Sequence, residues 1–321
     1  MIATPNANSE QSSIELYTGD ANARANTWAN LSPSDLRRRA MVPANNRDAA
    51  ELWSLTEAHL VLYGKAGVKA AAATIRAYRR GVYDLIEAWR GENLLRPRRD
   101  AGWQWVRSLE AAGKSPATVG VRLAAARALY SALHWAGATD VAPFLKVKPG
   151  RDSTPAWEKR HPYSEDELEK LMAEAGTADR VMILLGCHGG LRVSEMASLR
   201  WQDVDLSGGS LLVRDGKGGK ARTVVMSTTL RATMAALPRS GEDVLGFGDG
   251  RARQRMRRLC RSVGVAYKGV HALRHSCGTR CYRETRDLRV AAEHLGHSSI
   301  DTTRVYAKWD RETLRASVGA W

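Results

Sequence analysis

The stretch "SPATVGVRLAAARALYSALHWAG", residues 115–137, decides the fold of the first half of the chain. Ser115 suits a helix N-cap, Pro116 the first helical position, and Gly137 a position just past the helix end. Between them, apolar residues recur at spacings of three and four, which predicts a single buried helical face. Those residues are Val119, Leu123, Ala126, Tyr130 and Leu133. We therefore expect a long helix packed inside a helical domain.

Similar periodicity on both sides of this stretch extends the predicted helical domain over residues 46–146. Residues 1–45 are rich in Asn, Ser, Thr and Ala, and are expected to form a flexible N-terminal arm. Residues 147–162 break the periodicity with prolines and mixed charge, which indicates an interdomain linker.

A second domain is predicted over residues 163–321. It opens with Ser164 and Glu167, which have the spacing of a capping box. Residues 209–226, "GSLLVRDGKGGKARTVVM", predict two strands joined by a Gly-rich turn, and the rest is helical. The expected fold is mainly α: a helical N-terminal domain, then a mostly helical domain with a small antiparallel β-sheet.

Charge points to a polyanionic partner. The chain has 49 Lys and Arg against 34 Asp and Glu, a formal net charge of +15. Basic groups that neutralise phosphates release condensed counterions, so such an excess favours nucleic-acid binding. The longest apolar run, "VMILL", is too short to span a bilayer, and the N-terminus lacks the pattern of a signal peptide. We expect a cytoplasmic protein associated with the nucleoid, with no membrane partner.

The four cysteines form no C-x-x-C pair, which is typical of reduced thiols. His275, Cys277 and Cys281 lie close in sequence but lack the spacing of a four-ligand metal site. We interpret them as core residues and expect no metal.

Several short motifs could carry chemistry, although each alone is weak. In "HALRH", His271 and Arg274 fall on one helical face and could together hold a phosphate. In "GGLRVSEM", Arg192 has no packing reason for its position, and Glu195 could orient it from behind. Taken alone, each of these patterns is more often a solvated or capping group. Tyr306 in "LGHSSIDTTRVYAK" would likewise be a buried aromatic.

The combination and order of these motifs change that interpretation. With "GLRVSE", "DGKGGKAR", "HALRHS" and "LGHSSIDTTRVYA" in succession, the chain resembles the tyrosine recombinase (phage integrase) family. The match covers about residues 185–310, and the preceding helical region is similar to the family's core-binding domain, more loosely. The resemblance implies six catalytic residues: Arg192, Lys217, His271, Arg274, His297 and Tyr306.

The family's chemistry gives each position a role. Tyr306 would attack the scissile phosphate and form a 3′-phosphotyrosyl link, with His271 accepting its proton. The two arginines and His297 would bind the phosphate oxygens, and Lys217 would protonate the departing 5′ oxygen. No cofactor is implied, and the sequence contains no P-loop and no carboxylate cluster suited to magnesium.

The chain departs from the family pattern after "HALRH". Its "SCGTRC" replaces a Thr-Phe-Ala-Thr-like segment and puts Gly278 inside a predicted helix. The usual glycine between this helix and the next is also missing. These changes concern packing around the site and leave the six chemical positions intact.

The resemblance also implies that the protein binds double-stranded DNA between two domains. Basic side chains expected to contact DNA are Arg122, Lys220, Arg255 and Arg258. Similar proteins act as homo- or heterotetramers on paired sites, sometimes with a second recombinase or an accessory protein. The C-terminal stripe of Leu314, Val318 and Trp321 could pack on a neighbouring subunit or on its own.

The expected function is site-specific recombination of the Xer kind, which resolves chromosome or plasmid dimers. A mobile-element integrase is the alternative within the family, but residues 1–45 look too short and polar for the arm-binding domain that such integrases often carry. A type IB topoisomerase shares the chemistry, yet usually has another residue where His271 stands. A non-catalytic DNA-binding accessory protein is disfavoured because all six chemical residues are present.

Overall fold

The computed structural model describes residues 21–65, 67, 72–152, 154, 161–214, 221–296, 303 and 306. The chain divides into two compact units, Met1–Ser153 and Thr154–Trp321. The division falls inside the segment that the sequence predicted as a linker. Within the described residues, no helix has both the length and the apolar character needed to cross a membrane.

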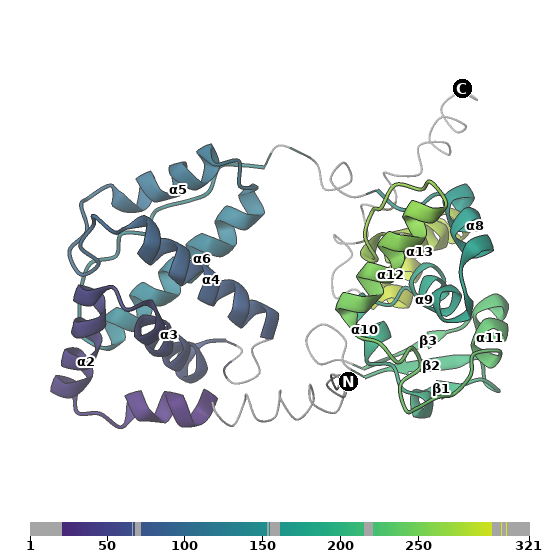
Figure 1. Ribbon diagram of the computed structural model, residues 1–321, viewed down its shortest axis with the longest axis horizontal. Helices are drawn as coiled ribbons and strands as arrows, with labels where there is room; N and C mark the ends of the chain where they lie inside the picture. Colours follow the sequence, from purple (N-terminus) through teal and green to yellow (C-terminus); the bar gives the residue numbers. More distant parts are fainter. Residues whose placement is uncertain are drawn as a thin grey trace, which may run out of the picture. The chain divides into compact units, whose positions relative to one another are not determined.

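The first unit is a bundle of helices (Figure 1). Residues 21–29 are helical, and the helices that follow are α2 (Pro33–Asn46), α3 (Ala49–Tyr63), α4 (Ala72–Ala88), α5 (Ala101–Ala111) and α6 (Pro116–Trp135). α6 is the predicted long helix: the Ser115 side chain caps its N-terminus and Pro116 is its first residue. Its buried face packs against α3, α4 and α5, so it forms the centre of the unit.

Residues 21–45 are helical and packed, which corrects the prediction of a flexible arm over that range. Trp28 is fully buried, and its indole nitrogen donates a hydrogen bond to the Ser54 hydroxyl on α3, at 3.0 Å. The Arg39 guanidinium on α2 stacks over the same ring, 4.1 Å from its centroid. A buried tryptophan removes a large apolar area from water, so this segment belongs to the core of the first unit.

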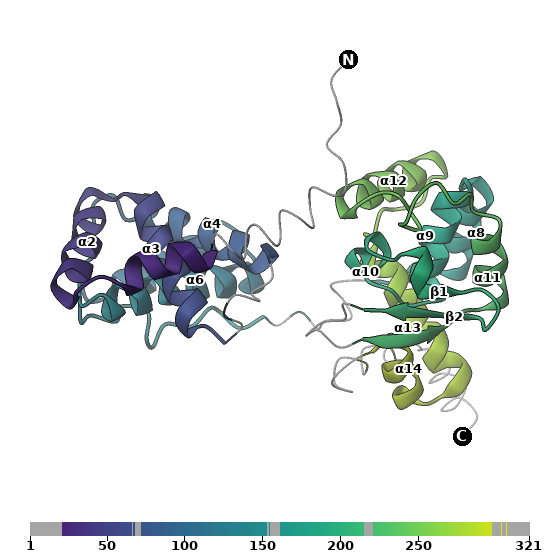
Figure 2. The ribbon, with the colours of Figure 1, turned by 90° about the horizontal axis from the view of Figure 1, so that it is seen from below.

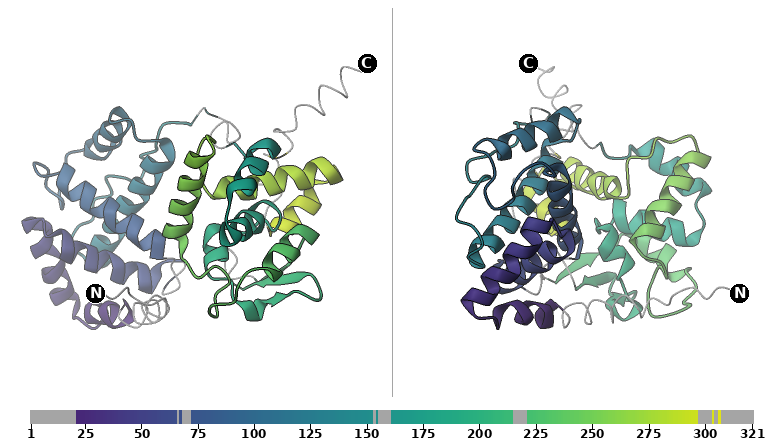
Figure 3. Two further views of the ribbon diagram at one scale, coloured as in Figure 1. Left: turned by 45° about the vertical axis from the view of Figure 1, so that its right-hand side comes forward. Right: turned by 60° about the vertical axis from the view of Figure 1, so that its left-hand side comes forward.

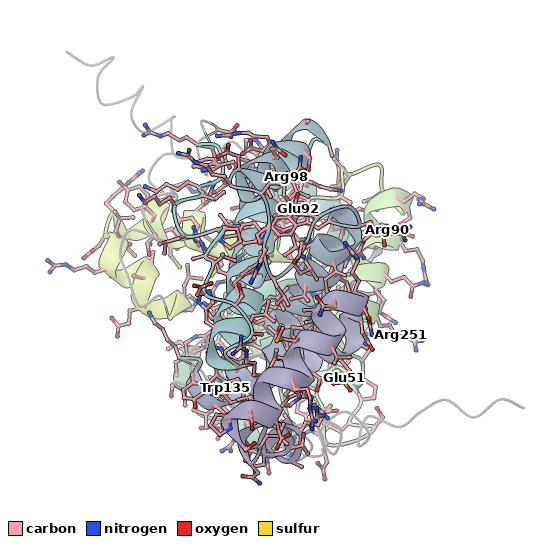
Figure 4. All side chains as sticks on the ribbon, turned by 90° about the vertical axis from the view of Figure 1, so that its left-hand side faces the viewer. Glu51, Arg90, Glu92, Arg98, Trp135 and Arg251 are labelled. Atoms are coloured by element: carbon pink, nitrogen blue, oxygen red, sulfur yellow. The ribbon has the colours of Figure 1, made fainter. Side chains whose placement is uncertain are left out.

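A loop between α4 and α5 is fixed by a buried carboxylate. Glu92 accepts hydrogen bonds from the backbone N–H of Arg98, at 2.7 Å, and from its side chain, at 2.8 Å. Figure 4 labels the two residues side by side. Tyr130 on α6 donates to the carbonyl of Leu94 at 2.7 Å, which ties the same loop to the central helix.

The second unit places helices around the central helix α9 (Thr177–Cys187), with a small sheet at one end (Figures 1 and 2). The other elements are α8 (Glu165–Glu174), α10 (Val193–Ala197), η2 (Trp201–Asp203), β1 (Val204–Asp205), β2 (Ser210–Val213), β3 (Arg222–Val225), α11 (Thr228–Ala235), α12 (Asp249–Ser262), α13 (His271–Thr285) and α14 (Leu288–Leu295). The apolar run at residues 181–185 is buried in α9, against α10, α11, α12 and α13.

The sheet has the order β1-β2-β3 and is antiparallel throughout. Leu211 pairs with Val224, and both side chains are buried while Val225 faces solvent. The two predicted strands are therefore present, and β1 is an addition. The turn that joins β2 to β3 lies outside the described residues, and so do Lys217 and Lys220.

Candidate active site

Glu195 is the centre of a cluster of arginines. Arg192 is the N-cap of α10, and its backbone N–H and guanidinium both donate to the Glu195 carboxylate, at 2.8 and 2.6 Å. Arg222, the first residue of β3, donates to both oxygens of the same carboxylate, at 3.0 and 2.8 Å. The carboxylate therefore fixes both guanidiniums, one from a helix start and one from the sheet.

Burial alone would raise the pKa of Glu195, whose side chain is only 2% exposed. The hydrogen bonds from Arg222 and Arg192 outweigh burial and lower the pKa to about 2. Glu195 is therefore ionised at neutral pH. A third guanidinium, that of Arg274, lies 4.0 Å from the same carboxylate. Three cations around one anion leave a positive excess that suits a phosphate.

Arg274 extends this cluster from α13. Its side chain is 1% exposed and donates to the carbonyls of Gly190 and Leu295, the latter at 2.7 Å. Burial, together with the charge on Arg192, lowers the pKa of Arg274 to about 10, which still leaves it charged at neutral pH. Carbonyls from two separate segments thus hold the guanidinium in place.

Tyr306 packs against α13, the helix that carries Arg274. It is 1% exposed, and its ring centroid is 6.0 Å from that of His275. Burial raises the pKa of the Tyr306 hydroxyl to about 12, although the charge on Arg274 acts in the opposite direction. The phenol is therefore neutral at physiological pH, and it lies close to the cations that would stabilise its anion.

Gly278 makes this position of Tyr306 possible. A Cβ atom on Gly278 would lie 2.4 Å from Cζ of Tyr306, much closer than van der Waals contact. α13 continues through this glycine, so the departure from the family pattern neither breaks the helix nor leaves a gap. The ring of Tyr306 occupies the space that a side chain at position 278 would fill.

We expect Gly278→Ala to destabilise the second unit by about 1 kcal/mol. The helix propensity of alanine would add about 1 kcal/mol of stability, but overpacking against the ring costs about 1–3 kcal/mol. Gly250 on α12 is the matched control, because a Cβ there meets nothing within 4 Å. Gly250→Ala should raise stability by about 0.5 kcal/mol. Urea unfolding measures the free energy of unfolding of both variants. If the two substitutions change it in the same direction, the packing account is contradicted.

Glu195→Gln should destabilise the second unit by about 3 kcal/mol at pH 7, because two partly buried guanidiniums lose their shared, buried counterion. The effect should depend on pH. A carboxyl whose folded-state pKa is lowered from 4.5 to about 2 contributes stability that is complete above pH 4.5 and is lost as pH falls through 2. Urea unfolding from pH 7 to pH 2 should therefore show the two proteins converging. A difference that stays constant over this range would rule out the ionised carboxylate as its source.

The structure brings together three of the six predicted catalytic positions and places a fourth on α13, the helix that carries one of them. Arg192, Arg274 and Tyr306 are within electrostatic reach of one another, and His271 is the first residue of α13. The His271 ring centroid lies 4.7 Å from that of His275. The remaining two, Lys217 and His297, lie outside the described residues.

Arg222 was missed from the sequence. The signal available was its place in "DGKGGKAR", directly after the predicted turn, where an arginine at the start of a strand has no obvious partner. Only folding shows that a carboxylate 27 residues earlier in the chain binds it. The contact between Arg192 and Glu195, by contrast, follows from their spacing.

The predicted DNA-contacting arginines differ in their surroundings. Arg122 pairs with Asp84 at 2.8 Å, and its side chain is 16% exposed. Arg255 pairs with Asp179 at 2.6 Å and stacks over Phe247. Arg258 is exposed on α12. Of these three, Arg258 is the one whose side chain is most open to a phosphate.

Comparison with protein families matches both units. Residues 163–312 match the model of the phage integrase family, and residues 67–137 match the model of the phage integrase N-terminal SAM-like domain. The chain is 32% identical over 267 residues to tyrosine recombinase XerC of Xanthomonas campestris pv. campestris, covering 76% of this chain and 81% of that protein. It is 35% identical over 167 residues to tyrosine recombinase XerA of Thermococcus kodakarensis, covering 47% of this chain and 59% of that protein.

Solved structures show the same fold. The XerH site-specific recombinase bound to a palindromic difH substrate aligns with a TM-score of 0.65 at 20% identity, covering 96% of each chain. A λ integrase tetramer bound to a Holliday junction aligns with a TM-score of 0.65 at 15% identity, covering 79% of this chain and 76% of that one. Both alignments include residues of the helical first unit and of the mixed second unit.

Proposed function

Because the chain belongs to the phage integrase family of tyrosine recombinases, we propose that it cleaves and rejoins DNA at specific sites with Tyr306 as its nucleophile. One observation carries the assignment of the nucleophile: Tyr306 is buried against α13, the helix that also carries His271 and Arg274. A tyrosine needs cations and a proton acceptor to react at neutral pH, and this helix supplies both.

The reaction exchanges one phosphoester for another. The Tyr306 oxygen forms a bond to phosphorus while the bond to the 5′ oxygen breaks, and the strand stays attached to the protein through its 3′ phosphate. His271 takes the phenolic proton, and Lys217 gives a proton to the 5′ oxygen. The phosphotyrosyl link keeps the bond energy, so a 5′ hydroxyl from another strand can reverse the step and complete the exchange.

The arginines stabilise the charge that develops on the phosphate. Arg192 and Arg274 would bind its non-bridging oxygens, and His297 would donate a further hydrogen bond. Glu195 and Arg222 act behind them: the carboxylate holds Arg192 in one rotamer, and Arg222 offsets the carboxylate's charge. This preorganisation matters because the transition state carries more negative charge than the starting phosphodiester.

Binding of the duplex would depend mainly on the attraction between basic side chains and the negatively charged DNA backbone. The chain carries a net charge of +15, and α12 presents arginines to solvent. We propose that Arg258 and Lys220 contact phosphate directly. Arg122 and Arg255 would contact DNA only through the part of each guanidinium that their carboxylate partners leave free.

The assembly we propose is a tetramer on two paired sites, homomeric or with a second recombinase. Strand exchange needs four tyrosines, one for each strand of two duplexes. The λ integrase structure to which this chain is similar is a tetramer on a Holliday junction. The Xer-named relatives favour the resolution of chromosome or plasmid dimers in the nucleoid over the integration of a mobile element.

Covalent capture tests this function. The purified chain is incubated with fragments of its own genome, and protein-linked DNA is isolated under denaturing conditions and sequenced. We expect adducts at one sequence or a small related set, each with two similar half-sites. Adducts spread over the genome would indicate a topoisomerase instead. A protein that shifts DNA on a gel but yields no adducts would be a binding protein without the proposed activity.

A further inference from the structure

α13 packs against α14 near the C-terminal end of the described residues (Figure 3). Two thiols and an imidazole from these two helices lie close together. Cys277 and Cys281 lie one turn apart on α13, and so on one face of that helix, while His294 lies in the last turn of α14. Their ligand atoms, two sulfurs and one ring nitrogen, all lie within 4.8 Å of one another. His294 lies 13 residues after Cys281 and on the next helix, so only folding brings the three groups together.

The spacing is close to that of a bound metal. Zinc binds sulfur at about 2.3 Å and nitrogen at about 2.0 Å, so ligand atoms on a tetrahedral site are about 3.3–3.8 Å apart. Shifts of about 1 Å or less, within the reach of side-chain rotation, would bring the three atoms to those distances. Cys277 is buried, whereas Cys281 and His294 are partly exposed, so an ion can reach the site from solvent.

The backbone beside the cluster already orients the imidazole. The carbonyl of His188, just past the end of α9, accepts hydrogen bonds from Nε2 of His294 at 2.8 Å and from the Cys277 thiol at 3.3 Å. With the proton on Nε2, the lone pair of His294 is on Nδ1. A histidine that gives its second N–H to a backbone carbonyl is the usual arrangement at protein metal sites.

The two thiols are not equivalent. The hydrogen bond between them raises the pKa of Cys277 and lowers the pKa of Cys281. Cys281 is the more exposed of the two sulfurs, so an ion that arrives from solvent reaches it first. Cys277 would lose its proton as the metal enters, which makes binding stronger at higher pH.

We propose that Cys277, Cys281 and His294 form a binding site for a thiophilic cation such as Zn²⁺, with a fourth position open to water. Both thiols release a proton to solvent, and the two thiolates balance the charge of a divalent ion. The site clamps α13 to α14. It adjoins the buried Tyr306, which packs in one cluster with Cys277 and Leu295. It requires no DNA, so it can be tested whether or not the chain recombines DNA.

Co²⁺ is the spectroscopic probe. The reduced, metal-free full chain is titrated with Co²⁺, and we expect one equivalent to give the sulfur-to-cobalt charge-transfer band and the strong visible bands of a tetrahedral thiolate complex. Zn²⁺ should displace the cobalt and raise the midpoint of thermal unfolding. Absence of these bands, or a zinc-independent midpoint, would overturn the proposal.

Variants assign the ligands. Cys281→Ser and His294→Ala should each weaken Co²⁺ binding by at least about a hundredfold, the upper range for losing even a group that only orients a ligand. Cys260→Ser is the matched control, because that thiol lies on α12 beside Tyr163 and should leave binding unchanged. Circular dichroism checks that each variant folds. Binding that survives both ligand variants, or disappears in Cys260→Ser, would place the cation elsewhere.

Discussion

Tyr306→Phe should abolish covalent attachment of the protein to DNA. The substitution removes one oxygen and keeps the ring that packs on Gly278, so the fold and the arginine cluster should persist. No other group in the proposed reaction can form the ester to phosphorus. On a nicked suicide duplex that carries the captured site, wild type should give an adduct on a denaturing gel, and Tyr306→Phe none.

The matched control is binding by the same variant. A gel shift should give the same affinity for wild type and Tyr306→Phe within about twofold, since the hydroxyl contributes little to phosphate-driven binding. Tyr282→Phe provides a second control, because Tyr282 also packs near the cluster of Cys277, Leu295 and Tyr306 but has no assigned role. An adduct formed by Tyr306→Phe, or lost in Tyr282→Phe, would show that the nucleophile is misassigned.

Arg274→Ala should slow cleavage by about a thousandfold or more. Removing one preorganised donor to a developing oxyanion costs about 10²–10³-fold in rate, and Arg274 offers two donors and a full charge. The substitution also leaves the carbonyls of Gly190 and Leu295 without their guanidinium donor. That loss should lower stability by about 1–3 kcal/mol for each buried carbonyl.

Arg274→Lys separates the two effects. Lysine keeps the charge but lacks the planar fork, so it should recover part of the stability and only a small part of the rate. Arg258→Ala is the surface control: it should weaken binding and reduce its salt dependence, yet leave the cleavage rate unchanged at saturating protein. Single-turnover cleavage rates measure all three variants. A cleavage rate for Arg274→Ala within tenfold of wild type would contradict its placement on the phosphate.

Much of the fold follows from local sequence. Ser115 with Pro116, and Ser164 with Glu167, begin helices where their spacing predicts. Local signals did not predict the packing of residues 21–45. More than half of the apolar residues in that segment are alanines, which bury little area, and Trp28 becomes a core residue only because α2 and α3 close over it.

The contacts in the candidate site likewise include some that are local in sequence and some that depend on tertiary packing. Arg192 and Glu195 are three residues apart, so their contact is local and predictable. The contact of Arg222 with Glu195, and that of Arg274 with Gly190, join residues far apart in the chain and depend on tertiary packing. Gly278 could be noticed from the sequence but not explained, because its partner ring belongs to Tyr306, 28 residues later in the chain.

The thiol cluster shows the same limit. From the sequence, His275 was the histidine nearest to Cys277 and Cys281, and those three gave no metal-site spacing. In the folded protein the histidine beside the two thiols is His294 on α14, whose ring nitrogen lies within 4.8 Å of both sulfurs. A ligand from the next helix is invisible to any search for short spacing patterns.

The most direct test of the central claim identifies the atom that carries the DNA. The adduct from the suicide duplex is digested with trypsin and nuclease, and the modified peptide is sequenced by mass spectrometry. We predict the nucleotide on Tyr306, in the peptide Val305–Lys308, joined through a 3′ phosphate, with a free 5′ hydroxyl at the cut. A nucleotide on another residue, or a link through a 5′ phosphate, would contradict the account.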